Sequence, residues 1–393
     1  MPGRILIFGA GASGRGHVGQ LAFESGHEVV FVDKDRDLVD RLRKAGRYTV
    51  RLVSAQPRDF VVDRFRTFHL DEREEIFQAF LESSLVFTVV CPNNLRDVAE
   101  YIRPMVIAWL QAGGREAKDL LACENMNQGS TTFRRFLLDG FPGGDAGAEL
   151  ARSLDARMGF ADTMIARVVA KPKDPLRLLG EEYSEWTADR KALRGAVPPQ
   201  IRTLDLVDDQ GRYLQRKLYI HNTGHAMFGY LGFLKGYEYI HEAARDPAIL
   251  QAAEKAIEES GWAIQHEHGF PEDVIRAYRK ALIDKCPCEA LPDEVVRVVR
   301  EPIRKLGPEE RFFGPAALLL KHGREPRVLL HGPCAAMLAR IPGDPESERM
   351  GRLLEDGGVR GVLAAIGVRM PDPVVRTMED LLPVLRESLG RRR

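Results

Sequence analysis

The sequence predicts an α/β protein in which an N-terminal Rossmann-type, doubly wound parallel sheet is followed by a mainly α-helical C-terminal domain. In the first half, short apolar segments alternate with amphipathic, helix-like ones. The apolar segments span residues 4–11, 28–33, 85–90 and 119–125. Apolar strands that alternate with helices indicate a parallel sheet covered on both faces. In the second half strand-like segments nearly vanish, and helical periodicity dominates.

A domain junction carries turn-forming residues, and the chain has such a region between its strand-rich first half and its helical second half. Pro198 and Pro199 are followed by the turn-rich DDQG at 208–211, which interrupts both periodicities. We therefore expect an NAD-binding Rossmann domain over residues 1–195 and a helical substrate-binding and catalytic domain over residues 196–393, with the active cleft between them.

Composition limits the partners and the compartment. Lys+Arg and Asp+Glu both number 57, so the formal net charge is zero, and neither nucleic acid nor a membrane surface is expected as a partner. Five cysteines in 393 residues favour a reducing compartment over a disulfide framework. Because no secretory leader and no run of about 18 apolar residues is found, we expect a cytoplasmic protein, a monomer or small homo-oligomer.

The segment FGAGASGRG supplies a candidate nucleotide site. Gly9, Gly11 and Gly14 have the G-x-G-x-x-G spacing directly after the first apolar segment. The first glycine permits a tight turn, the second lets the backbone around Ala10 approach a pyrophosphate, and the third allows close packing of helix on strand. The N-terminus of the next helix would then face the pyrophosphate. An ordinary glycine-rich turn is the alternative.

Asp33 predicts which dinucleotide is bound. It ends the second apolar segment, about 20 residues after the glycines, where an acidic residue accepts hydrogen bonds from the ribose 2′-OH. Its charge would repel a 2′-phosphate, so we expect NAD rather than NADP. Lys34 and Arg36 follow it and could weaken that preference.

The segment RKLYIHNTGHAMFGYLG, residues 216–232, is helix-like and apolar almost all round, yet it contains Lys217, Asn222 and His225. A helix of this kind is normally buried. At about 100° per residue, His225 lies about 80° and Asn222 about 140° from Lys217, so all three can face one cleft. Desolvation would favour the neutral amine of Lys217, a proton acceptor. Alternatively, Lys217 extends to the surface while Asn222 and His225 bond to each other.

With these residues, the chain resembles the mannitol dehydrogenase family of polyol-specific long-chain dehydrogenases. Its K-x4-N-x2-H motif matches Lys217, Asn222 and His225, and its C-(D/E)-N-M motif matches ACENM, which contains Asn125. The resemblance implies a metal-independent, NAD-dependent oxidoreductase with Lys217 as general base, Asn222 and Asn125 as donors to the reacting oxygen, and His225 as a substrate contact.

The resemblance is greatest with the shorter members of the family, which interconvert mannitol 1-phosphate and fructose 6-phosphate. One departure affects the substrate. Where many members carry an aspartate in an M-V-D-R-I block, this chain has Ala166, and the lost carboxylate would change how the hydroxyls of the polyol are bound.

A local cluster of positive charge could hold the phosphate of such a substrate. Arg304, Lys305 and Arg311 lie in IRKLGPEERF, and arginine forks match phosphate geometry. A solvated surface is the alternative reading of this cluster.

Two short motifs invite a metal site, but neither has a suitable spacing. CPC at 286–288 lacks a second cysteine pair, and the histidines of HEH at 266–268 do not share a helix face. We therefore expect no metal.

Two other functions compete with the polyol-phosphate dehydrogenase. One is a reductase of sugar acids or unphosphorylated polyols. The other is a non-catalytic dinucleotide sensor, which would have no use for a lysine, two asparagines and a histidine arranged as here.

Overall fold

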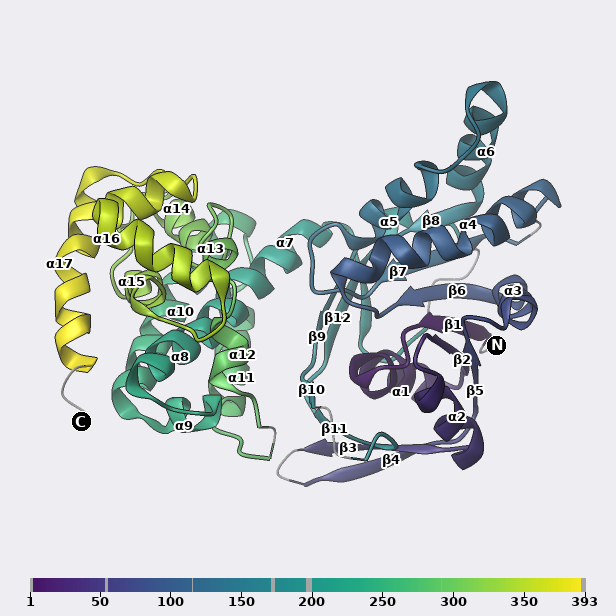
Figure 1. Cartoon of the computed structure of the whole chain (residues 1–393), viewed down its shortest axis with the longest axis horizontal. Helices are drawn as coiled ribbons and strands as arrows, with labels where there is room; N and C mark the ends of the chain where they lie inside the picture. The colour runs from purple at the N-terminus through teal and green to yellow at the C-terminus, as the bar shows by residue number, and fades with distance from the viewer. Residues whose placement is uncertain are drawn as a thin grey trace. The chain divides into compact units, whose positions relative to one another are not determined.

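The computed structural model describes residues 3–53, 56–114, 116–170, 174–195, 200–290 and 292–389. The chain forms two compact units, Met1–Tyr213 and Leu214–Arg393, drawn in Figure 1. The division falls within helix α7 (Gln210–Arg216), later than the boundary expected after residue 195. The reason is strand β13 (Leu204–Val207), which pairs with β12 (Glu185–Asp189) and so belongs to the first unit.

The first unit is built on a six-stranded parallel sheet, as the sequence predicts. In spatial order its strands are β5 (Phe65–His69), β2 (Glu28–Asp33), β1 (Arg4–Phe8), β6 (Ser83–Thr88), β7 (Lys118–Ala122) and β8 (Met158–Phe160). All five pairings are parallel. The four apolar segments predicted as strands are β1, β2, β6 and β7, the centre of this sheet.

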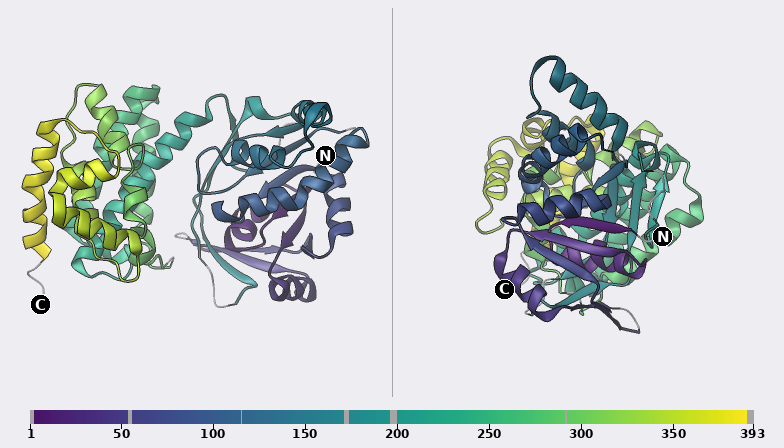
Figure 2. Two further views of the ribbon diagram at one scale, coloured as in Figure 1. Left: turned by 45° about the horizontal axis from the view of Figure 1, so that its top comes forward. Right: turned by 90° about the vertical axis from the view of Figure 1, so that its right-hand side faces the viewer.

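Alternate residues of these strands pack into two separate cores. Ile5 and Ile7 of β1 lie in the core that includes Val18 and Leu21, from the π-helix η1 (Gly14–Gly19) and helix α1 (Gln20–Glu24). Leu6 and Phe8 lie in the other core, under four helices. These are α3 (Arg73–Glu82), α4 (Leu95–Gln111), α5 (Gly129–Leu138) and α6 (Gly144–Arg157). Both faces of the sheet are therefore covered, as Figure 2 shows. Because side chains on both faces are buried, the central strands contain continuous apolar runs.

Two smaller sheets complete the first unit and were not predicted. One has the order β10 (Val169–Ala170), β11 (Arg177–Glu181), β3 (Tyr48–Val53) and β4 (Arg58–Val62); the other has β13, β12 and β9 (Thr163–Ala166). Helix α2 (Arg36–Ala45) precedes β3. These strands have two to six residues and no common burial pattern, so the sequence signal for them is weaker than for the central sheet.

The second unit is helical, as predicted. Its central helix is α8 (Asn222–Lys235), preceded by the π-helix η4 (Lys217–His221). Around it lie α9 (Ile240–Arg245), α10 (Pro247–His268), α11 (Glu272–Lys285), α12 (Val295–Val299), α13 (Pro302–Lys305), α14 (Phe313–Lys321), α15 (His331–Leu338), α16 (Pro345–Ala365) and α17 (Asp372–Leu389).

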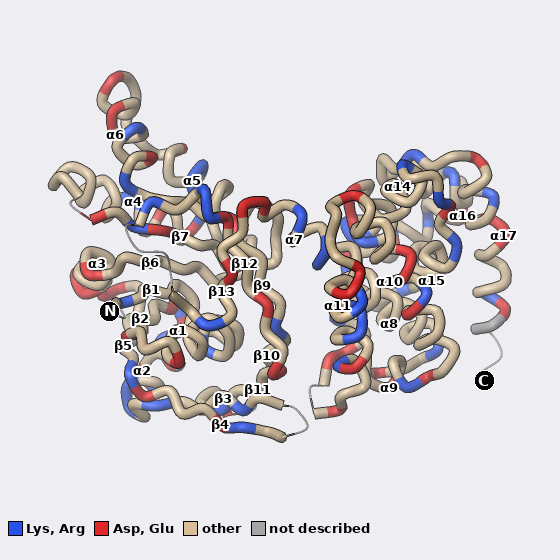
Figure 3. Tube along the Cα trace, turned by 180° about the vertical axis from the view of Figure 1, so that it is seen from behind, with Lys and Arg blue, Asp and Glu red and all other residues tan. Residues whose placement is uncertain are grey.

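Glycines let the neighbouring helices approach α8 closely. A Cβ added at Gly224 would lie 2.6 Å from a Leu282 methyl carbon and 2.8 Å from one of Ile257. Across the described residues, none of the helices combines the length and the apolar character needed to cross a bilayer. Positive and negative side chains are interspersed along both units (Figure 3).

Candidate functional site

The glycine motif forms the turn between β1 and the π-helix η1, at the carboxyl edge of the sheet. Gly9 has φ +104°, and a Cβ there would lie 2.3 Å from the Val89 carbonyl oxygen. A Cβ at Gly14 would lie 1.9 Å from the Gly9 oxygen, whereas one at Gly11 would meet nothing within 4 Å. The first and third glycines are thus required by packing. The open space at the second is what the approach of a pyrophosphate needs, so the turn fits a dinucleotide.

Asp33 lies beside this turn. Its Oδ2 accepts a hydrogen bond from the Ala10 N–H at 2.6 Å, and its Oδ1 accepts one from the Asp35 N–H at 3.0 Å. The carboxylate is therefore held where a ribose would follow the pyrophosphate. Arg36, which could have offset its charge, pairs instead with Asp71 at 2.5 Å.

Arg15, within the motif, was not singled out from the sequence. Its side chain is buried, and it donates from Nε to the Ala10 carbonyl at 2.6 Å and from Nη1 to the Pro175 carbonyl at 2.5 Å. Burial lowers the pKa of Arg15, while Tyr48 and Asp33 act in the opposite direction. Arg15 thus stabilises the glycine turn through hydrogen bonds to two backbone carbonyls. The glycine motif leaves this position variable, so the sequence pattern alone does not predict its role.

The ends of β6 and β7 lie at the same edge. Asn125, the proposed oxyanion donor of the first unit, is exposed just after β7. Its neighbour Glu124 is buried and accepts a hydrogen bond from the Val90 N–H at 2.8 Å. Burial raises the pKa of Glu124, opposed by hydrogen bonds including the one from Val90. Glu124 therefore ties the end of β7 to the segment that packs on Gly9.

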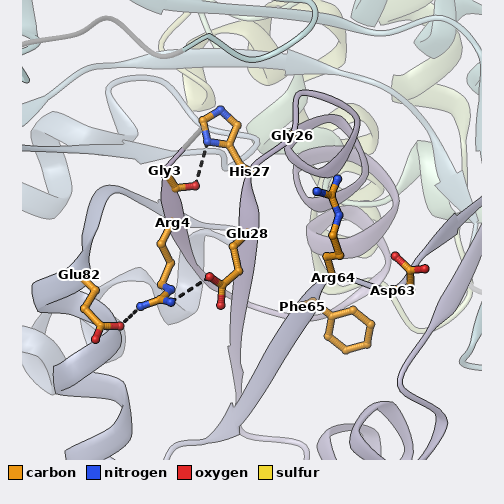
Figure 4. A pocket seen from close by; sticks show the side chains of 9 residues that line it. All are labelled: Gly3, Arg4, Gly26, His27, Glu28, Asp63, Arg64, Phe65 and Glu82. Atoms are coloured by element: carbon orange, nitrogen blue, oxygen red, sulfur yellow. Dashed lines mark hydrogen bonds and ion pairs between the residues drawn. The ribbon is translucent and has the colours of Figure 1, made fainter. Parts of the chain in front are cut away.

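A cavity of about 670 Å³ opens at the other edge of the sheet. Figure 4 shows Arg4 between Glu28 and Glu82, with His27 directed at the Gly3 carbonyl. These residues start β1 and β2 or end α3. Ligands of open α/β sheets bind at the carboxyl ends of the strands, so we do not assign the cofactor to this cavity.

In the second unit, Lys217 and Asn222 are joined by a helical irregularity. The N–H of Asn222 donates to the carbonyl of Lys217, an i→i+5 bond that closes one turn of the π-helix η4. A π-turn holds one more residue than an α-turn, and such turns are frequent at functional sites. Lys217 and Asn222 are consequently nearer in rotation about the helix than the about 140° expected for a regular α-helix.

His225 has a carboxylate partner that lies far away in the sequence. Its Nε2 is 2.9 Å from Asp293 Oδ2, and Asp293 also receives two hydrogen bonds from Arg297, at 2.7 and 2.8 Å. Burial lowers the pKa of His225, against the opposing effect of Asp293. In the neutral ring Nε2 then carries the hydrogen, and Nδ1 is the acceptor. Hence Asn222 and His225 do not simply satisfy each other.

His221 and Lys285 are further basic groups beside this pair. The Lys285 Nζ lies 3.4 Å from the His221 Nε2, and the rings of His221 and His225 have centroids 6.3 Å apart. Both side chains are partly buried. Neither residue belongs to a motif, although the position of His221 one helical turn before His225 is a sequence signal for it.

The structure brings Arg304, Lys305 and Arg311 together but surrounds them with acceptors. Arg304 pairs with Glu301 at 2.7 Å, and Arg311 pairs with Glu310 at 2.9 Å. Lys305 is buried and donates to the Val298 carbonyl at 2.8 Å; burial lowers its pKa to about 7. The cluster is therefore not the unbalanced positive patch that the local sequence suggests.

Two remaining sequence features are placed as follows. Ala166, at the family's aspartate position, is buried in β9 and pairs with Glu185 of β12. Among the described residues, no group of three or more His, Cys, Asp or Glu side chains could hold a metal ion. His266 stacks on Trp262, with ring centroids 3.7 Å apart, and His268 lies 2.7 Å from Gln215.

Known structures share this fold across nearly the whole chain. Mannitol 2-dehydrogenase of Pseudomonas fluorescens, in a ternary complex with NAD and D-mannitol, superposes with a TM-score of 0.74 at 18% identity, covering 99% of this chain and 92% of that one. A D-sorbitol dehydrogenase in substrate-free form gives a TM-score of 0.80 at 17% identity, covering 98% and 93%.

The shared fold does not identify the family, whereas sequence comparisons do. The Rossmann domain of mannitol dehydrogenases matches residues 3–201, and their C-terminal domain matches residues 209–352. A mannitol-1-phosphate 5-dehydrogenase of Geobacillus thermodenitrificans is 34% identical over 385 residues, 96% of this chain and 97% of the relative. One of Thermoanaerobacter pseudethanolicus is 31% identical over 394 residues, 99% and 100%. The chain therefore belongs to the mannitol dehydrogenase family, as its motifs suggest.

Proposed function

We propose that this chain is an NAD-dependent dehydrogenase that interconverts mannitol 1-phosphate and fructose 6-phosphate, with Lys217 as general base. Family membership makes it an oxidoreductase with a Rossmann domain, and the curated relatives that cover nearly its full length are named mannitol-1-phosphate 5-dehydrogenases. The observation that carries the proposal is the π-turn, which pairs Lys217 with Asn222 one turn before His225.

Lys217, Asn222 and His225 of the second unit have different proposed roles in the reaction. The amine of Lys217 takes the hydroxyl proton as the alcohol is oxidised, and returns it in the reverse direction. The amide of Asn222 donates to the same oxygen and stabilises its developing negative charge, with Asn125 proposed as a further donor. His225, held by Asp293, accepts a hydrogen bond at Nδ1 from a substrate hydroxyl and fixes the sugar's orientation.

The residues of the first unit fit NAD. The cofactor supplies the hydride acceptor when it is bound. The turn at Gly9, Ala10, Gly11 and Gly14 is shaped for a pyrophosphate, and the carboxylate of Asp33 accepts the ribose hydroxyl hydrogen bonds. The reaction needs no metal, because amide and ammonium donors serve the oxygen on which charge develops.

A substrate panel tests the proposal. Purified protein is assayed for NADH formation with mannitol 1-phosphate, sorbitol 6-phosphate, free mannitol and free sorbitol, and for NADH consumption with fructose 6-phosphate and hexuronates. We expect the highest kcat/KM with mannitol 1-phosphate and fructose 6-phosphate. Equal turnover of free mannitol, or preference for a hexuronate, would replace the proposal with the unphosphorylated-polyol or sugar-acid alternative, for which Ala166 leaves room.

NAD binding without turnover of any of these compounds would instead favour the dinucleotide sensor. The panel therefore separates the three functions that the sequence leaves open. We place the protein in the cytoplasm and expect neither a nucleic acid nor a membrane partner.

A further inference from the structure

The helix that carries Lys217, Asn222 and His225 has two differently occupied sides. On one side, Tyr219 donates to the Glu309 carbonyl at 3.1 Å and Thr223 donates to the Arg311 carbonyl. Residues two apart on an α-helix, such as Thr223 and His225, differ in direction by about 200°. The segment containing Arg311 therefore packs on the side of the helix away from His225.

The other side carries basic groups from a different helix. Lys285, the last residue of α11, reaches His221, which is one turn before His225 on the same side. Asp293, a carboxylate on this side, receives hydrogen bonds from His225 and Arg297. Lys285 and His221 thus place two basic groups next to the residues proposed to act on the reacting carbon.

The electrostatic field at His221 has the same sign. Burial is the main cause that lowers the pKa of His221 well below its usual value, followed by Lys285, His225 and Lys217. Charges that disfavour a proton at one point favour an anion there. Arg304 and Arg311 are paired with Glu301 and Glu310, and their segment packs on the side of the helix away from His225.

We propose that Lys285 and His221 form the subsite that holds the phosphate group of the substrate, in place of the cluster at Arg304, Lys305 and Arg311. This inference rests on the proposed polyol-phosphate activity. Lys285 donates its ammonium hydrogens to the phosphate oxygens, and a dianion beside His221 favours the protonated imidazole, which becomes a second charged donor.

Lys285→Met tests the subsite, because it removes the charge and keeps the length of the side chain. With mannitol 1-phosphate, KM should rise about 10- to 100-fold while kcat changes much less, the pattern of lost uniform binding. Lys285→Arg should recover most of the affinity. KM for NAD should not change. Lys280→Met, the same substitution at an exposed residue of α11 paired with Asp284, is the matched control.

Arg304→Met separates the two candidate phosphate sites. If it raises KM for mannitol 1-phosphate and Lys285→Met does not, the proposal is overturned and the phosphate lies at the arginine cluster. If the unmodified protein oxidises no phosphorylated polyol, the proposed function fails as well. These two failures are distinguishable because the first leaves the activity of the unmodified protein intact.

Inorganic phosphate gives a measurement that does not depend on the folding of Lys285→Met. It should inhibit the unmodified enzyme competitively with mannitol 1-phosphate, and His221→Gln should weaken that inhibition about tenfold. Inhibition that is unaffected by His221→Gln, or that is not competitive, would contradict the subsite.

Discussion

At the scale of single residues, we propose that Asp33 determines which dinucleotide the first unit accepts. Its carboxylate is fixed beside the glycine turn by the Ala10 N–H, where a 2′-phosphate would meet a like charge. We expect a clearly lower kcat/KM with NADP than with NAD, and we expect Asp33→Ala to narrow the difference. Steady-state kinetics with both cofactors measure this; equal use of both by the unmodified protein would contradict the role of Asp33.

In the proposed mechanism, Lys217 is the residue on which the chemistry depends most. Lys217→Ala should lower kcat by about 10²–10⁴-fold, the usual contribution of a positioned general base, because no other amine then takes the hydroxyl proton. Turnover numbers and NADH titration are the measurements, with NADH binding retained as the control; a nearly normal kcat would remove Lys217 from the mechanism.

His225 depends on a residue that no local pattern identifies. Asp293 accepts the Nε2 hydrogen and raises the pKa of His225 against the larger lowering by burial. Asp293→Asn should lower the pKa of His225 further and loosen the ring. We expect kcat/KM for mannitol 1-phosphate to fall about tenfold, with KM for NAD unchanged. Arg297→Met, which leaves the His225 contact in place, should have a smaller effect; equal losses in both variants would argue against a specific role for Asp293.

At the scale of elements, Asp246 caps the N-terminus of α10 and forms an ion pair there with Lys235. Asp246 accepts hydrogen bonds from the Ala248 and Ile249 N–H groups at 3.0 and 3.2 Å, and it pairs with Lys235 at 2.8 Å. Helix α9 ends at Arg245 and α10 begins at Pro247. Proline is favoured at the first position of a helix, because its missing N–H needs no partner there.

Replacing this cap should destabilise the second unit. Asp246→Ala should lower the free energy of unfolding by about 2 kcal/mol, since it removes an N-cap and a partly buried ion pair. Asp246→Asn, which keeps the cap, should cost less. The hydrogen bonds of Asp246 outweigh its burial and lower its pKa to about 2. Its contribution is therefore present near neutral pH and is lost as the pH falls through about 2. Thermal unfolding of the three proteins at two pH values measures both effects.

At the scale of the whole molecule, the proposed mechanism uses ammonium and amide N–H donors in place of a metal to stabilise the reacting oxygen. Dialysis against a chelator should therefore leave NADH formation unchanged. Metal analysis of the active protein provides the control. Activity that is lost on dialysis and restored by zinc would contradict the metal-independent mechanism.

Much of the fold and part of the candidate site can be predicted from the sequence alone. The strands β1, β2, β6 and β7 are buried on both faces, so each contains an uninterrupted run of apolar residues. The glycine spacing and Asp33 are equally local, since a turn and the next strand end are set within a few tens of residues. The K-x4-N-x2-H motif lies within one helix, and family comparison confirms the resemblance drawn from it.

Only the tertiary structure decides what surrounds those motifs. The π-turn that aligns Lys217 with Asn222 departs from the regular period that a sequence pattern assumes. Lys285 and Asp293 reach His221 and His225 from 64 and 68 residues away, and Glu301 and Glu310 neutralise the arginines that look unbalanced in the sequence. Strands such as β3 and β12 likewise depend on distant partners. Local sequence determines periodicity and turn chemistry, whereas charge balance and side-chain orientation depend on contacts between segments that only folding brings together.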